Sequence, residues 1–146
     1  MKAKLIFYWI TTGLIALETF AGGVMDLIPG GTSVVSGPLV TDTVTSLGYP
    51  VYLLTLLGIW KLPGAIFLVT PRFLRVKEWA YAGIFFELSG AAFSHAVAGH
   101  KSDVVAPLVL ASLAVASWAL RPPNRILGGS LWPAQTGKVA VRAGVT

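Results

Sequence analysis

Four long runs of apolar residues organise the chain, at residues 5–27, 51–70, 79–99 and 104–120. Because a helix rises about 1.5 Å per residue, about 20 apolar residues cross the roughly 30 Å hydrocarbon core of a bilayer. Three runs reach that length, and the last, with 17 residues, is near the lower limit. The pattern therefore predicts an all-α integral membrane protein built as a four-helix bundle.

The runs also set the domain organisation. Residues 1–121 form one predicted membrane domain, in which residues 39–47 are expected to add a short helix on the outer surface. Residues 122–146 are rich in Pro, Gly and basic residues and are predicted to be a flexible cytoplasmic tail. The first run also has features of a signal peptide, but Glu18 interrupts it and its apolar character continues to Leu27, which favours a retained span.

Basic residues predict which side of the membrane each loop faces, because Lys and Arg are enriched in cytoplasmic loops. The side that holds both termini carries nine of them: Lys2, Lys4, Arg72, Arg75, Lys77, Arg121, Arg125, Lys138 and Arg142. The opposite side carries only Lys101. Both termini are therefore predicted to be cytoplasmic.

Composition agrees with a membrane protein and narrows its chemistry. Hydrophobic residues make up 55% of the chain and charged residues only 12%, unlike an ordinary soluble domain. Without any cysteine, the chain has no disulfide, thiolate nucleophile or cysteine-bound metal. The net charge of +5 comes from residues spread along the edges of the apolar runs. The expected counterpart is thus the lipid bilayer, and no nucleic acid is expected.

Three of the runs carry a charged residue near the middle of the membrane: Glu18, Lys61 and Glu87. Each charge exposed to lipid at that depth costs about 2.5–3.5 kcal/mol, so the three side chains are expected to face one another inside the bundle. Two carboxylates and one ammonium leave an excess negative charge. One glutamate is therefore expected to hold a proton or to attract a cation or another hydrogen-bond donor.

Small residues share the helix faces of these charges, which favours close contact between helices. The stripes are Thr11, Glu18 and Gly22 in the first run, Gly58, Lys61 and Ala65 in the second, and Gly83, Glu87, Gly90 and Ser94 in the third. A compact bundle with a polar core is predicted. A purely structural role for this charge cluster, fixing helix register, is the alternative interpretation.

His95 follows this core toward the outer side and is interpreted as a polar lining residue that exchanges a proton with Glu87. His100 lies five positions later, about 140° around the same helix, so no metal or haem is expected between the two histidines. Asp26, Lys101 and Asp103 are interpreted as a solvated rim. The predicted ligand-binding or proton-handling core is Glu18, Lys61, Glu87, Ser94 and His95.

The sequence has no Gly-rich phosphate loop, nucleophile elbow or zinc-binding helix motif. No catalytic residues are assigned, and activity as an independent enzyme is not expected.

Several short motifs resemble those of the DoxX-like family, over about residues 5–121. They are Leu47-Gly48-Tyr49-Pro50, then Leu57-Gly58-Ile59-Trp60-Lys61-Leu62, then Lys77-Glu78-Trp79-Ala80-Tyr81-Ala82-Gly83, and finally Gly90-Ala91-Ala92 with Ser94-His95. The resemblance implies four spans in a bacterial cytoplasmic (inner) membrane. Better-known proteins bearing the DoxX name are linked to thiosulfate:quinone oxidoreductase and to membrane complexes that handle oxidative stress.

The leading hypothesis is a non-catalytic membrane subunit whose polar core binds a lipid-like or quinone-like ligand and supports a partner redox system. Lys61 would donate to a ligand oxygen, and Glu18 and Glu87 would share the proton. Candidate partners are a membrane or peripheral redox protein and a second copy of the chain. The alternatives are a small-molecule or proton-coupled transporter, and an assembly or scaffold protein. The transporter is disfavoured because residues 62–69 offer little polarity on the way to the cytoplasm.

Overall fold

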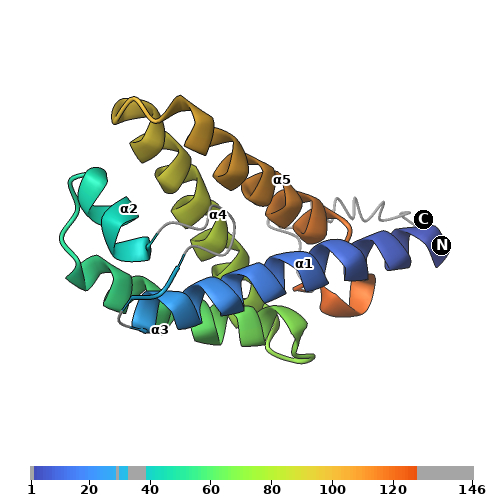
Figure 1. Cartoon of the computed structure of the whole chain (residues 1–146). Coiled ribbons are helices and arrows are strands. Elements are labelled where there is room, and N and C mark those ends of the chain that lie inside the picture. Colours follow the sequence, from blue (N-terminus) through green and yellow to red (C-terminus); the bar gives the residue numbers. More distant parts are fainter. Residues whose placement is uncertain (1, 29, 33–38, 128–146) are drawn as a thin grey trace, which may run out of the picture.

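The computed structural model describes residues 2–28, 30–32 and 39–127, and over these residues the chain is mainly helical (Figure 1). The elements are α1 (Lys2–Leu27), α2 (Val40–Ser46), α3 (Tyr52–Val69), α4 (Leu74–Val97), the short 3₁₀ helix η1 (Lys101–Val104), α5 (Val105–Ala119) and a second 3₁₀ turn, η2 (Pro123–Arg125). The all-α prediction is confirmed for this part of the chain. Lys138 and Arg142 of the predicted tail lie outside it.

Helices α1, α3, α4 and α5 coincide with the four apolar runs, and α2 is the predicted short helix. Within the described residues, three segments are long and apolar enough to cross a membrane: α1, α3 and the stretch 101–119 that contains α5. Helix α4 has 24 residues but is not one of them. Its polar side chains, Glu87 and His95 among them, lower its hydropathy.

Helix α1 packs against α3 and α5, and α4 packs against the same two helices. The start of α1 and the end of α5 lie at the same end of the molecule, where α3 also turns into α4 (Figure 1). Helix α2 and the turn between α4 and α5 lie at the opposite end. All the described basic residues except Lys61 and Lys101 belong to the start of α1, to the turn between α3 and α4 with the first turn of α4, or to the segment after α5, so we call this end the basic end.

The contact between α1 and α3 depends on glycine. A Cβ atom on Gly58 would lie 2.6 Å from Leu27 Cγ and 2.9 Å from the Gly23 carbonyl oxygen, and one on Gly23 would lie 2.8 Å from Lys61 Cβ. The two backbones can approach this closely only without side chains. On α4 the expectation of close contact is wrong for Gly83 and Gly90, because a Cβ at either position would have nothing within 4 Å.

Three hydroxyl groups connect the helices inside the apolar core. The Ser117 hydroxyl of α5 lies 2.6 Å from that of Thr12 in α1 and 2.8 Å from that of Tyr81 in α4. All three residues are buried among apolar side chains such as Ile15 and Leu68. Because buried hydroxyls need partners, this cluster fixes how α1, α4 and α5 sit against one another.

At the basic end, cationic side chains cap the last carbonyl groups of α3. Lys77 is fully buried, and its Nζ donates to the carbonyl oxygens of Leu68 at 2.6 Å and Thr70 at 2.8 Å. Helix C-termini leave such carbonyls without partners inside the helix, and cations there complement the helix dipole.

Arg125 adds a third contact, from its guanidinium to the Val69 carbonyl oxygen at 3.1 Å, and it lies over the Trp9 ring at 4.5 Å from the ring centre. Arg125, in the predicted flexible tail, is therefore buried against the helices. Residues 128–146 lie outside the described part.

A second ionic contact joins α4 and the end of α5 nearby. The Arg121 guanidinium pairs with the Glu78 carboxylate, which also accepts a 2.9 Å hydrogen bond from Trp118 Nε1. Glu78 precedes the apolar run 79–99. Burial acts to raise the pKa of this carboxyl, but the hydrogen bonds from Arg121 and Trp118, and the charge of Arg121, outweigh it and lower the pKa.

Large apolar side chains cover the outside of the helices. Trp79 is 78% exposed, Val97 72% and Phe93 71%, and many other large apolar residues are more than a third exposed. A soluble monomer rarely shows so much contiguous apolar surface. Lipid is the solvent that this surface suits.

Candidate polar core and cavity

A cavity of about 530 Å³ opens between the helices and α2, away from the basic end. Its walls include apolar side chains from α2, α3, α4 and α5, such as Val40, Leu57, Leu88 and Leu110. The polar residues that line it include Glu18, Asp26, Lys61, Glu87, Ser94 and His95. All five residues of the predicted core therefore border one space.

Lys61 is the centre of the polar group. Its Nζ lies 2.8 Å from Asp26 Oδ2 on α1 and 2.8 Å from Glu87 Oε1 on α4. The side chains are largely shielded, with 15% of Lys61, 6% of Asp26 and 24% of Glu87 exposed. One ammonium group thus connects α3 to two other helices.

The placement of Asp26 on a solvated rim is wrong. Asp26 follows Glu18 and Gly22 at spacings of four residues, so all three share the face of α1 that meets α3. The side chain of Lys61 is long enough to reach it from the middle of α3. The spacing of four was the signal in the sequence that could have placed Asp26 in the core.

Glu18 borders the same space without sharing the ammonium. A Cβ on Gly22 would lie 3.6 Å from Lys61 Nζ and 3.7 Å from Glu18 Oε1, so both groups flank this glycine. Among the described residues, the ion pairs of Lys61 are those with Asp26 and Glu87. Three carboxyl groups therefore face one ammonium, a larger acid excess than the sequence pattern suggested. A proton, a cation or hydrogen-bond donors must offset it.

Ser94 connects α4 to the chain that follows α2. Its hydroxyl donates to the Gly90 carbonyl oxygen at 2.9 Å and lies 2.8 Å from the Tyr49 hydroxyl, which is left to donate to it. Gly48, at φ +83°, ends α2 and turns the chain so that Tyr49 can make this contact. Tyr49 was not among the predicted core residues.

His95 lies at the outer end of the cavity, close to His100. The ring centres are 5.9 Å apart, so the expectation that the two histidines point in different directions is wrong. That expectation assumed a helix continuing through residue 99, whereas α4 ends at Val97. Nδ1 of His95 is buried without a hydrogen-bond partner among the described residues.

The arrangement offers groups that can bind a ligand. The acid oxygens can accept hydrogen bonds, and Lys61 has a third N–H beyond the two that its carboxylate partners use. The apolar walls can hold a hydrocarbon chain or ring beside this polar group. A ligand with one polar and one apolar part would satisfy both.

Comparison with known families identifies a match to the DoxX-like family over residues 10–117. The matched segment contains every polar residue of the cavity named above. No curated protein and no solved structure shows significant similarity to the chain. The family match and the apolar helices together indicate a small membrane protein.

Proposed function

Because the chain belongs to the DoxX-like family, we propose that it is a small bacterial inner-membrane protein in which α1, α3, α4 and α5 form a spanning four-helix bundle. Helix α4 serves as the fourth span because its apolar part, from residue 79 onward, leads from the basic end to the far end, where α5 begins. The basic end faces the cytoplasm, in keeping with the distribution of Lys and Arg. Both termini are then cytoplasmic.

Its function in this proposal is to bind a lipid-like or quinone-like ligand as a non-catalytic subunit that supports a partner redox protein. The observation that carries the proposal is the cavity of about 530 Å³, which combines apolar walls with Glu18, Lys61 and Glu87. The third N–H of Lys61 donates to a ligand oxygen, and Glu18 accepts a hydrogen bond from a ligand hydroxyl. A quinol carries two hydroxyl groups on one ring. The oxygen of one can accept the hydrogen bond from Lys61, and the other can donate to Glu18.

Filling the cavity tests this function directly. Gly90 lines the cavity, and a Cβ on it would have nothing within 4 Å, so the backbone there has room for a side chain and Gly90→Leu should take up part of the cavity. Gly83→Leu is the matched control, because Gly83 lies on the same helix with equally open surroundings and does not line the cavity.

The measurement is the thermal unfolding of the purified chain in mild detergent with a short-chain quinol, combined with mass spectrometry of copurifying lipids and quinones. The unfolding temperature of the wild type and of Gly83→Leu should rise with the quinol, because the ligand binds the folded state. That of Gly90→Leu should not. A wild type that copurifies with neither ligand class and does not respond to quinol would exclude this function.

A proton-coupled transporter is the second candidate, favoured by the excess of acid around Lys61. The apolar residues Ile15, Leu68 and Leu88 pack together in the core, and two of them, Ile15 and Leu68, do not line the cavity. A polar path to the basic end would have to cross this core. Solute flux in proteoliposomes that depends on a proton gradient and is lost in Glu87→Gln would favour transport.

A further inference from the structure

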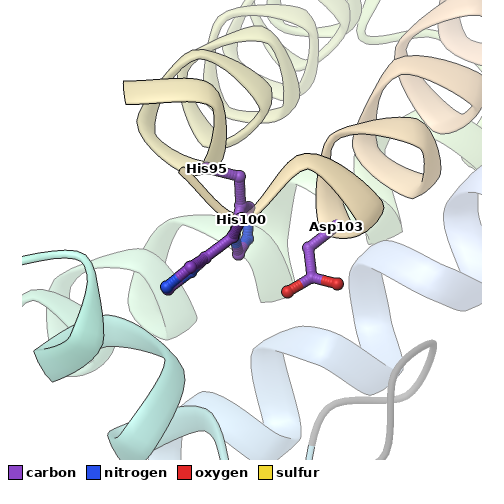
Figure 2. Close-up of side chains that lie close together, drawn as sticks. All are labelled: His95, His100 and Asp103. Atoms are coloured by element: carbon purple, nitrogen blue, oxygen red, sulfur yellow. The ribbon is translucent and has the colours of Figure 1, made fainter. Parts of the chain in front are cut away.

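We propose a divalent transition-metal site at the turn between α4 and α5, formed by His95, His100 and Asp103. One ring nitrogen of each histidine and one carboxylate oxygen lie within 4.8 Å of one another. Figure 2 shows the three side chains extending from the same turn toward one side. This site borders the same cavity as the ligand proposed for Lys61 but uses other side chains and does not depend on that ligand.

The end of α4 brings the two histidines together. The His100 N–H donates to the His95 carbonyl oxygen at 2.9 Å, and the Gly99 N–H donates to that of Ala96 at 3.2 Å. Gly99 has φ +82°. These are the bonds of a Schellman motif, in which the second residue beyond the helix cap folds back onto the last turn. His100 therefore lies beside His95 by the geometry of the helix end.

Asp103 is held in the adjoining 3₁₀ helix. Its N–H donates to the His100 carbonyl oxygen at 3.0 Å, and its Oδ1 accepts a 2.9 Å hydrogen bond from the Ser102 hydroxyl. Such a bond orients a carboxylate for metal binding. The backbone thus fixes all three candidate ligands within nine residues, 95–103.

A second observation points to a ligand here. Nδ1 of His95 is buried, with no hydrogen-bond partner in the part of the chain that the structure describes. A buried polar atom without a partner is unfavourable and calls for an explanation. A metal ion coordinated by this Nδ1 would supply the missing partner.

The ligand set favours Zn²⁺ or a similar ion. Imidazole nitrogen suits Zn²⁺, Co²⁺ and Ni²⁺, whereas Mg²⁺ and Ca²⁺ prefer oxygen. Zinc–ligand bonds of about 2.0–2.2 Å in a tetrahedron separate the ligand atoms by roughly 3.3–3.5 Å. Modest side-chain rotations would bring the three ligand atoms from within 4.8 Å of one another to that separation. Three protein ligands leave a fourth position free. His95 and Asp103 also line the cavity, so the ion can be reached from it.

The test uses the full chain in mild detergent, with any affinity tag removed and bound metal stripped by a chelator. Co²⁺ is titrated as a spectroscopic probe, and Zn²⁺ is then added as a competitor. We expect one Co²⁺ per chain with the visible absorption of a low-coordinate site, and full displacement by Zn²⁺ but not by Mg²⁺ or Ca²⁺. Weak, octahedral Co²⁺ absorption without saturation would overturn the proposal.

Variants assign the ligands. Loss of a residue that only orients a metal ligand weakens binding roughly 10- to 100-fold. His100→Ala and Asp103→Asn each remove a proposed ligand, so each should weaken Zn²⁺ binding by more than that. Asp42→Asn is the control, because Asp42 is an exposed carboxylate on α2, outside the cluster. Unchanged affinity in His100→Ala would also overturn the proposal. Because Asp103 is exposed and lies outside the long helices, Asp103→Asn keeps the test valid if His100→Ala fails to fold.

Discussion

Asp26, next to the last residue of α1, lies 2.8 Å from Lys61 in the middle of α3. The contact holds the outer end of α1 against α3, beside the close approach at Gly23 and Gly58. Asp26 also shares the ammonium of Lys61 with Glu87. The stability of the polar core therefore depends on a carboxyl group outside the three charges that the sequence places at mid-membrane.

Removing either partner of this pair should destabilise the protein. Asp26→Asn should lower the free energy of unfolding by about 1.5–3 kcal/mol, the range for a hydrogen bond to a charged group. Lys61→Met should lower it by about 3–5 kcal/mol, because it leaves carboxylates without a compensating charge. Denaturation in detergent micelles measures both. The double variant should lose less than the sum, and strict additivity would mean that the two groups do not interact.

The glycine contact between α1 and α3 predicts a contrast between two substitutions on one helix. Gly58→Ala should destabilise the protein by about 1–3 kcal/mol, because the new Cβ would meet a backbone oxygen at 2.9 Å. Gly64→Ala should be neutral or stabilising, because a Cβ there has nothing within 4 Å and Ala favours helix. Thermal unfolding of both variants checks this. Equal effects would show that the close contact does not govern α1–α3 packing.

The buried hydroxyl cluster predicts a large effect of a small change. Ser117→Ala should destabilise the protein by about 1–3 kcal/mol, because the hydroxyls of Thr12 and Tyr81 both lose their contact with it. Ser112→Ala is the matched control on the same helix, since Ser112 is exposed and, among the described residues, its hydroxyl bonds only to the Leu108 carbonyl oxygen of its own helix. Its effect should be within about 0.5 kcal/mol. A similar loss in both variants would argue against the cluster.

The pairing of Glu78 with Arg121 predicts a pH dependence in acid. The pKa of the folded Glu78 lies below its usual value of 4.5, so the unfolded chain binds more protons there. Its stabilising contribution is therefore complete above about pH 4.5 and is lost as pH falls through the lower folded pKa. Glu78→Gln should reduce stability at neutral pH and flatten the acid decline of the unfolding temperature. An unchanged acid profile would contradict the assignment.

The helices could be predicted because the thickness of the bilayer fixes the length of an apolar run, and the four runs coincide with α1, α3, α4 and α5. The common space around Glu18, Lys61 and Glu87 could be predicted for a similar reason, since charges avoid lipid.

The contact of Asp26 was missed because its position near the end of an apolar run suggested solvent. That of His100 was missed because the helix was expected to continue beyond Val97. Asp26 lies on the buried face of α1, which the four-residue spacing from Glu18 and Gly22 encodes. His100 follows Gly99, the glycine at the end of α4. Hydropathy alone cannot distinguish such a glycine from one that continues the helix. Both errors came from using only the position of a residue along an apolar run. The face of α1 on which Asp26 lies and the way α4 ends before His100 were not considered.

Arg125 approaches Tyr8 and Val69 at the basic end, and Ser117 bonds to Thr12 across 105 positions of the chain. A ribosome makes α1 before it makes Ser117 or Arg125. The hydroxyl of Thr12 can therefore bond to Ser117 only after α1, α3, α4 and most of α5 have been synthesised. Insertion of α1 and its packing against α5 are thus separate events. A chain truncated before Ser117 would leave Thr12 of α1 without this hydrogen-bond partner.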